Sequence, residues 1–237
     1  MILRFLPPAA VCLLFLTGCL KGDDQLKPEE LNAAIEYAIS SGTGGMAAQF
    51  DDVLIALQQA EAGKTVAIMR QCNTVLDSTV IRADTLWNLF YTYVFHWSYL
   101  LTCDAQDDPI SFRFDYDGSG SFDAPRMSGS GQVNARYNVT GLSPSDNAYL
   151  YNGTYMREGN LQSKAGRQIA FSILTTVVLQ DVRINKSNRK IISGSALLTV
   201  SGELSNGQGF NYEGSMIFPG NGSVTVTVNG RTFTFTL

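Results

Sequence analysis

Residues 223–237 read SVTVTVNGRTFTFTL, and this stretch decides the class of fold. Apolar residues alternate with threonine on both sides of Asn229-Gly230, which is the strongest short signal for a two-residue β-hairpin turn. We therefore expect an antiparallel hairpin in which Val226 faces Phe233 across the strand pair. One face of this hairpin is apolar and the other is a ladder of threonines, as in a sheet with one buried and one solvated face.

The alternating pattern extends back to about residue 66, and turn signals divide it into about ten strands. Residues 168–184 carry apolar side chains first at odd and later at even positions, which predicts a β-bulge between them. The expected turns are Asp117–Gly120, Ser143–Asp146, Lys186–Asn188, Ser205–Gly207 and Pro219–Gly222.

Residues 28–63 instead show the 3.6-residue period of amphipathic helices. Pro28 and the two glutamates that follow it suit the first turn of a helix, and Gly42–Gly45 ends that helix. A second helix is expected over Ala47–Ala62, with Gly63 as its C-cap.

The sequence thus predicts a mainly β protein of the α+β type. A helical hairpin at 28–63 packs on a large curled antiparallel sheet formed by residues 64–237. About ten strands in one twisted sheet tend to curl, so we expect an open or closed barrel-like shape. A β-sandwich of two sheets is the alternative.

The first 18 residues have the features of a secretion signal. Met1–Arg4 carries positive charge, and the apolar run that follows is too short for a helix that spans a bilayer. Leu16-Thr17-Gly18-Cys19 resembles the lipobox of bacterial lipoproteins, whose cysteine is acylated and becomes the new N-terminus. The resemblance implies that Cys19 carries lipid, a stable membrane anchor, and that residues 19–27 form a tether. An ordinary signal peptide with a chance cysteine is the alternative.

The tether also suggests a location. Its start, Leu20-Lys21-Gly22-Asp23-Asp24, is similar to the acidic export tag of Bacteroidota-type lipoproteins displayed on the cell surface. We expect attachment to the outer membrane through the lipid on Cys19, on the cell surface or on the periplasmic face.

Two cysteines remain once Cys12 leaves with the signal and Cys19 carries lipid. Outside the cytoplasm, Cys72 and Cys103 are expected to form a disulfide. Two free thiols or a metal pair are the alternatives. A metal is disfavoured because the chain has no C-x-x-C motif and one histidine, His96.

Alternate positions of residues 89–103 place a row of aromatic side chains on one face of a single strand. An exposed aromatic row can stack on sugar rings, whereas a buried one belongs to the core. Both interpretations stay open for the candidate ligand face, and His96 lies on the opposite face. The members of this face are Tyr91, Tyr93, Trp97 and Tyr99, with Phe95 between them.

Composition and motifs argue against several functions. Charged residues make up 16% of the chain and its formal net charge is −4, which excludes a disordered polyelectrolyte and a nucleic-acid binder dependent on positive charge. The motifs G-x-S-x-G and H-E-x-x-H and a phosphate-binding loop are absent from the sequence. We expect no enzyme and no cofactor, although glycosidase chemistry by paired carboxylates stays open.

Charge is unevenly distributed along the chain. Residues 104–123 hold six aspartates against one arginine, and residues 157–190 hold seven basic residues against two acidic ones. The two segments either pair with each other, face solvent, or bring the basic segment to anionic headgroups. Asp115-x-Asp117-x-Ser119-Gly120 begins like a calcium loop, but the position of the bidentate glutamate holds Arg126, so a hairpin turn is expected there.

The span from Cys103 to the terminal hairpin resembles outer-membrane lipoproteins of Bacteroidota-type bacteria that carry a β-rich domain of unknown function. The resemblance implies family membership and no activity. It is carried by Asp108-Pro109, Pro125-Arg126-Met127, Asn152-Gly153-Thr154-Tyr155 and Ser193-Gly194-Ser195.

Three functional hypotheses follow. The first is a non-catalytic binding or structural module of the cell envelope, with a protein, glycan or other envelope component as partner. The second is a carrier or chaperone of apolar ligands, resembling the lipoprotein-localisation factors that combine a half-barrel with covering helices. The third is an integral outer-membrane β-barrel, suggested by the alternating aromatic residues at Phe233 and Phe235.

Overall fold

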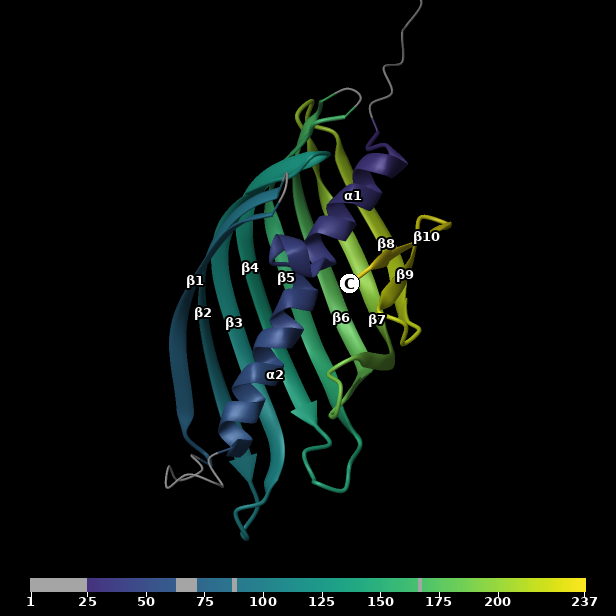
Figure 1. Ribbon diagram of the computed structural model, residues 1–237. Helices are drawn as coiled ribbons and strands as arrows, with labels where there is room; N and C mark the ends of the chain where they lie inside the picture. Colours follow the sequence, from purple (N-terminus) through teal and green to yellow (C-terminus); the bar gives the residue numbers. More distant parts are fainter. Residues whose placement is uncertain (1–24, 63–71, 87–88, 166–167) are drawn as a thin grey trace, which may run out of the picture.

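The computed structural model describes residues 25–62, 72–86, 89–165 and 168–237 (Figure 1). The helical part comprises α1 (Pro28–Ile39), the 3-10 turn η1 (Ser41–Thr43) and α2 (Met46–Ala62). The strands are β1 (Val75–Leu86), β2 (Leu89–Cys103), β3 (Pro109–Asp123), β4 (Met127–Thr140), β5 (Ala148–Ser163), β6 (Ala170–Asn185), β7 (Ile191–Leu204), β8 (Gly209–Phe218), β9 (Ser223–Val228) and β10 (Arg231–Thr236).

Each strand pairs antiparallel with the next one along the chain, so the sheet has the order β1 to β10 without a crossover. This confirms the predicted large antiparallel sheet and its number of strands. The sheet is curled and open, because β1 and β10 form its two edges and do not pair with each other among the described residues. The described strands form one sheet, and not the two sheets of the alternative sandwich.

The two helices lie along the concave face of this sheet, end to end across the strands (Figure 1). The carboxylate of Glu30 accepts a hydrogen bond from the backbone N–H of Lys27 at 2.8 Å, which closes the first turn of α1 behind Pro28. Both helices begin and end within one residue or two of the predicted positions, and Gly63 lies outside the described residues. No helix in the described part of the chain is long and apolar enough to cross a membrane.

The core lies between the helices and the concave face. Strand residues alternate between buried and exposed positions, so each strand sends every second side chain toward the helices. Ile35, Ile39 and Leu54 of the helices are at most 1% exposed and belong to the same apolar cluster as the inward residues of the strands. The two helices are therefore held by the sheet, as short helices that would be marginal alone require.

The terminal hairpin has the predicted register. Val226 pairs with Phe233, and the threonine hydroxyls of the other face meet across the strands at 2.9 and 3.1 Å. Asn229 and Gly230 both adopt positive φ, 50° and 70°, as a type I′ turn requires.

The predicted bulge in β6 is also confirmed. The pairing with β7 shifts between Gln180 and Arg183, and Asp181 has a φ of 52°. The side chain of Asn152 on β5 stabilises this kink: its Oδ1 accepts from the backbone N–H of Asp181 at 3.0 Å, and its Nδ2 donates to the carboxylate of Asp181 at 3.2 Å.

One expected turn is wrong. Residues 117–120 do not form a hairpin turn but lie within β3, paired with β2 and β4. Gly118 and Gly120 point to the concave face directly opposite Phe95 and Tyr93. A Cβ at either glycine would lie closer than 3.0 Å to the ring opposite it. These glycines therefore make room for aromatic rings of the neighbouring strand.

Candidate functional site

The predicted aromatic face lies on the concave side of β2, beneath the helices. Tyr93 and Tyr99 are only 2% and 8% exposed, while Tyr91 and Trp97 are partly exposed and pack against the same core. The Tyr93 ring stacks on the Phe95 ring, with centroids 5.3 Å apart. In this arrangement the row contributes to the core.

A polar seam centred on Arg157 crosses this apolar interface. Nη1 of Arg157 donates to the backbone carbonyl of Tyr37 at 2.9 Å and lies 3.5 Å from that of Thr43, and Nη2 donates to the Tyr93 hydroxyl at 2.5 Å. The guanidinium also lies 5.4 Å from the ring centre of Phe122. The cation is thus satisfied by helix-end carbonyls, a hydroxyl and π faces.

Two buried tyrosines continue the seam. The Tyr155 hydroxyl donates to the carbonyl of Ala38 at 2.6 Å, and the Tyr137 hydroxyl donates to Oε1 of Gln49 at 2.7 Å. Burial raises the pKa of Tyr155 to about 12, with the nearby Arg157 acting in the opposite direction. The phenol therefore stays neutral at physiological pH and keeps its proton for the hydrogen bond.

Two ion pairs join the helices to the sheet near the edges of their interface. Asp52 of α2 pairs with Arg82 of β1, and Glu36 of α1 pairs with Arg126 before β4 at 2.5 Å. Burial raises the pKa of Asp52, and the attraction of Arg82 offsets part of this effect. Together with the seam, these contacts hold α1 and α2 at a fixed position on the sheet.

Sequence reasoning did not single out Arg157, which counted only as one member of a basic segment. The sequence does indicate an inward position for this arginine. Arg157 follows Tyr155 by two residues, so both side chains point to the same, inward face of β5. A charged residue at a core-facing strand position needs polar partners, which here come from the last turn of α1, from η1 and from the Tyr93 hydroxyl.

A groove of about 310 Å³ lies between α2 and the C-terminal half of the sheet. Its floor is formed by Phe50 and Leu54 of α2 and by Ile184 of β6, with the partly exposed Ile191 and Leu237 beside them. Its rim carries both charges, Asp51 against Arg189 and Lys190. The groove can receive an apolar group. Its rim is polar and carries both positive and negative charges, without a strong excess of either.

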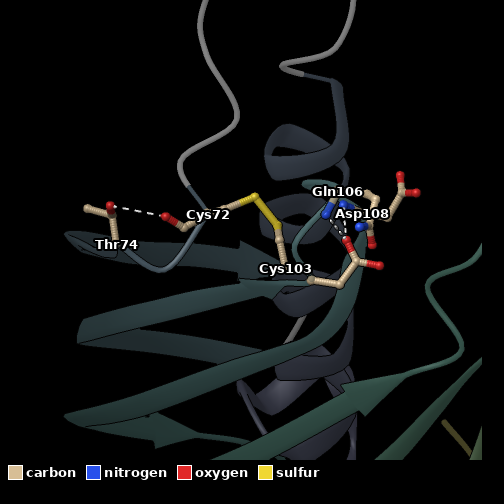
Figure 2. Close-up of a disulfide and its surroundings, with 6 residues drawn as sticks. Cys72, Thr74, Cys103, Gln106 and Asp108 are labelled. Carbon is tan, nitrogen blue, oxygen red and sulfur yellow. Dashed lines mark hydrogen bonds between the residues drawn. A yellow bond between two sulfur atoms is a disulfide. The ribbon is translucent and has the colours of Figure 1, made fainter.

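The predicted disulfide between Cys72 and Cys103 is confirmed (Figure 2). It joins the segment before β1 to the end of β2, where the backbone N–H of Asn73 also donates to the carbonyl of Leu101 at 2.7 Å. The adjoining β2–β3 turn is closed by the carboxylate of Asp104, which accepts from the backbone N–H groups of Gln106 and Asp108 at 2.9 and 2.8 Å. The disulfide is structural and lies at the end of the sheet where β2 ends.

The acidic and basic segments meet at one described ion pair, between Asp123 and Lys164. Asp115 instead pairs with Arg113 and Arg136 on the convex face. The calcium-like sequence lies within β3 and does not form a loop, and no group of three metal-ligating side chains is found in the described ranges.

Cys19, its tether and the signal segment lie outside the described residues, so lipidation stays a prediction. Comparison with models of known families, with curated proteins and with solved structures finds no match.

Proposed function

We propose that this protein is a lipid-anchored, non-catalytic module of the bacterial outer membrane that binds an apolar ligand in the groove beside α2. The observation that carries the proposal is the groove itself, whose floor consists of Phe50, Leu54 and Ile184. Its volume of about 310 Å³ is at the lower end of the range of small-molecule sites. This corresponds to the second hypothesis from the sequence, a binder of apolar ligands.

The rigidity of the groove wall supports this function. α2 is fixed by the Tyr137–Gln49 hydrogen bond and by the Asp52–Arg82 ion pair, and the turn before it is fixed by Arg157. A preformed wall loses little conformational entropy when a ligand binds. The interface beneath the end of α1, in contrast, is filled, with a residual cavity of about 20 Å³ next to Tyr37 and Arg157. A ligand is therefore expected beside α2 and not beneath the end of α1.

Filling the groove is expected to abolish binding of an apolar probe. Ala47 lines the groove and is partly exposed, so Ala47→Phe places a ring in the space that the ligand would occupy. We expect the purified protein to bind N-phenyl-1-naphthylamine with a rise in fluorescence, and Ala47→Phe to weaken this binding at least about tenfold, the equivalent of about 1.4 kcal/mol.

The matched control is Gln59→Phe, which adds the same ring at an exposed position of α2 that does not line the groove. This variant should bind the probe like the unchanged protein. Equal binding by all three proteins, or no binding by the unchanged one, contradicts the proposed site.

The anchor is tested separately. In a bacterial host supplied with an alkyne-labelled palmitate, the protein should acquire the label and fractionate with the outer membrane, because the lipobox resemblance places acyl chains on Cys19. Cys19→Ser should remove both the label and the membrane association, whereas Cys12→Ser should retain both. Labelling of the Cys19→Ser protein would exclude Cys19 as the acylated residue.

A further inference from the structure

The convex face of the sheet carries a second hollow, separate from the groove and on the opposite side of the sheet. This hollow has a volume of about 390 Å³ and is formed by outward side chains of β2 to β6. Its polar lining consists of His96, Asp117, Ser119, Gln132, Asn134 and Glu158.

The strand register places these side chains in two rows that cross the strands. In the first row His96 lies opposite Asp117, Asp117 opposite Asn134, and Asn134 opposite Met156. Directly paired residues on adjacent strands point to the same side of a sheet, and the strands lie about 4.8 Å apart.

The second row runs parallel to the first. Gln132 of β4 lies opposite Glu158 of β5, and Glu158 lies opposite Leu174 of β6. The first row is polar on β2 to β4 and ends with Met156 on β5. The second row starts with Val94 on β2, is polar from Ser119 on β3 to Glu158 on β5, and ends with Leu174 on β6. Because every member is on a strand in the middle of the sheet, the rows are held in place without a ligand.

The chemistry of the two rows suits sugar hydroxyls. Carboxylates accept hydrogen bonds and amides both donate and accept them, so together they can pair with hydroxyls that do the same. The His96 ring is oriented by the Thr79 hydroxyl, 2.8 Å from its Nδ1, which leaves Nε2 as the ring nitrogen for another partner. Met156 is 39% exposed and Val94 38%, and they supply apolar surface for the C–H faces of a sugar ring.

The charges of the hollow select among glycans. Asp117 and Glu158 are its charged members, and no lysine or arginine lines it. Arg113 and Arg136, on the same face of β3 and β4, are both bound to Asp115. Carboxylates without basic partners repel an anionic ligand. We infer that the convex hollow binds a neutral glycan.

This site differs from the aromatic face that the sequence suggested for sugar stacking. The aromatic row of β2 points to the concave side under the helices, whereas His96 and Val94 of the same strand point to the convex side. The inference does not depend on the proposed apolar groove, since the two sites share no lining residue.

Affinity electrophoresis of the purified protein tests the inference. The gels contain dextran, laminarin, xylan or mannan as neutral polysaccharides, or polygalacturonate as an anionic one. We expect at least one neutral polysaccharide to retard the protein and polygalacturonate to leave its mobility unchanged. Asp117→Ala and Asn134→Ala should each weaken the retarding interaction about tenfold, the effect of losing one hydrogen bond to a ligand.

Asp146→Ala is the control, since it removes the same charge from an exposed turn that does not line the hollow. It should be retarded like the unchanged protein, and so should the groove variant Ala47→Phe. The inference is overturned by the absence of retardation in all four neutral gels, by equal retardation in polygalacturonate, or by unchanged retardation of both hollow variants.

Discussion

Replacing Gly120 with alanine is expected to lower the free energy of unfolding by about 3 kcal/mol, the upper part of the range for overpacked cores. Gly120 lies opposite Tyr93, and an added Cβ would collide both with the Tyr93 ring and with the backbone carbonyl of Thr92. The ring cannot retreat easily, because its hydroxyl accepts a hydrogen bond from Arg157 and its face stacks on Phe95. Chemical denaturation followed by circular dichroism measures the loss.

Ser121→Ala is the matched control on the same strand. Ser121 is exposed on the convex face, so this substitution should change the free energy of unfolding by less than about 0.5 kcal/mol. If residues 117–120 formed an exposed turn, Gly120→Ala would cost little more than the control. Equal stability of the two variants would therefore contradict the pairing of β3 with β2 at this position.

The same residues explain why the sequence misleads at this point. Aspartate, glycine and serine in succession have the composition of a turn, and the pattern within residues 117–120 cannot distinguish a turn glycine from one that faces a ring. The deciding partners, Phe95 and Tyr93, are more than 20 residues away and become neighbours only when β2 pairs with β3. A glycine in a strand opposite an aromatic residue is a tertiary feature.

Features governed by local chemistry were predictable. The two helices, the Asn229-Gly230 hairpin with its register, and the bulge in β6 all follow from periodicity and turn residues within about 20 positions. The disulfide followed from elimination, because two cysteines remain after the predicted processing.

The candidate sites depend on contacts between distant segments. The groove combines α2 with β6, β7 and the chain after β10, and the convex hollow combines side chains of five strands. Arg157 shows the same limit: its position on β5 places it inward, but its carbonyl partners come from the last turn of α1 and from η1, more than 110 residues earlier. Periodicity indicates which face a residue occupies, and only the packed structure shows what lies opposite.

Removing the disulfide is expected to lower the free energy of unfolding by about 3–4 kcal/mol, because the bond reduces the chain entropy of the loop that it closes in the unfolded protein. Cys72 and Cys103 are 31 positions apart, and their bond encloses both β1 and β2. The edge strand β1 pairs with β2 alone among the described strands, so the bond also limits how far this edge can separate from the sheet.

The double variant Cys72→Ser/Cys103→Ser should therefore unfold at lower denaturant concentration than the oxidised protein, as monitored by circular dichroism. Adding a reductant to the unchanged protein should reproduce the same shift, and it should have no further effect on the double variant. The single variant Ser121→Ala, which leaves the bond intact, serves as the control. Coincident unfolding curves for the oxidised protein and the double variant would mean that pairing between β1 and β2 holds this edge without the covalent bond.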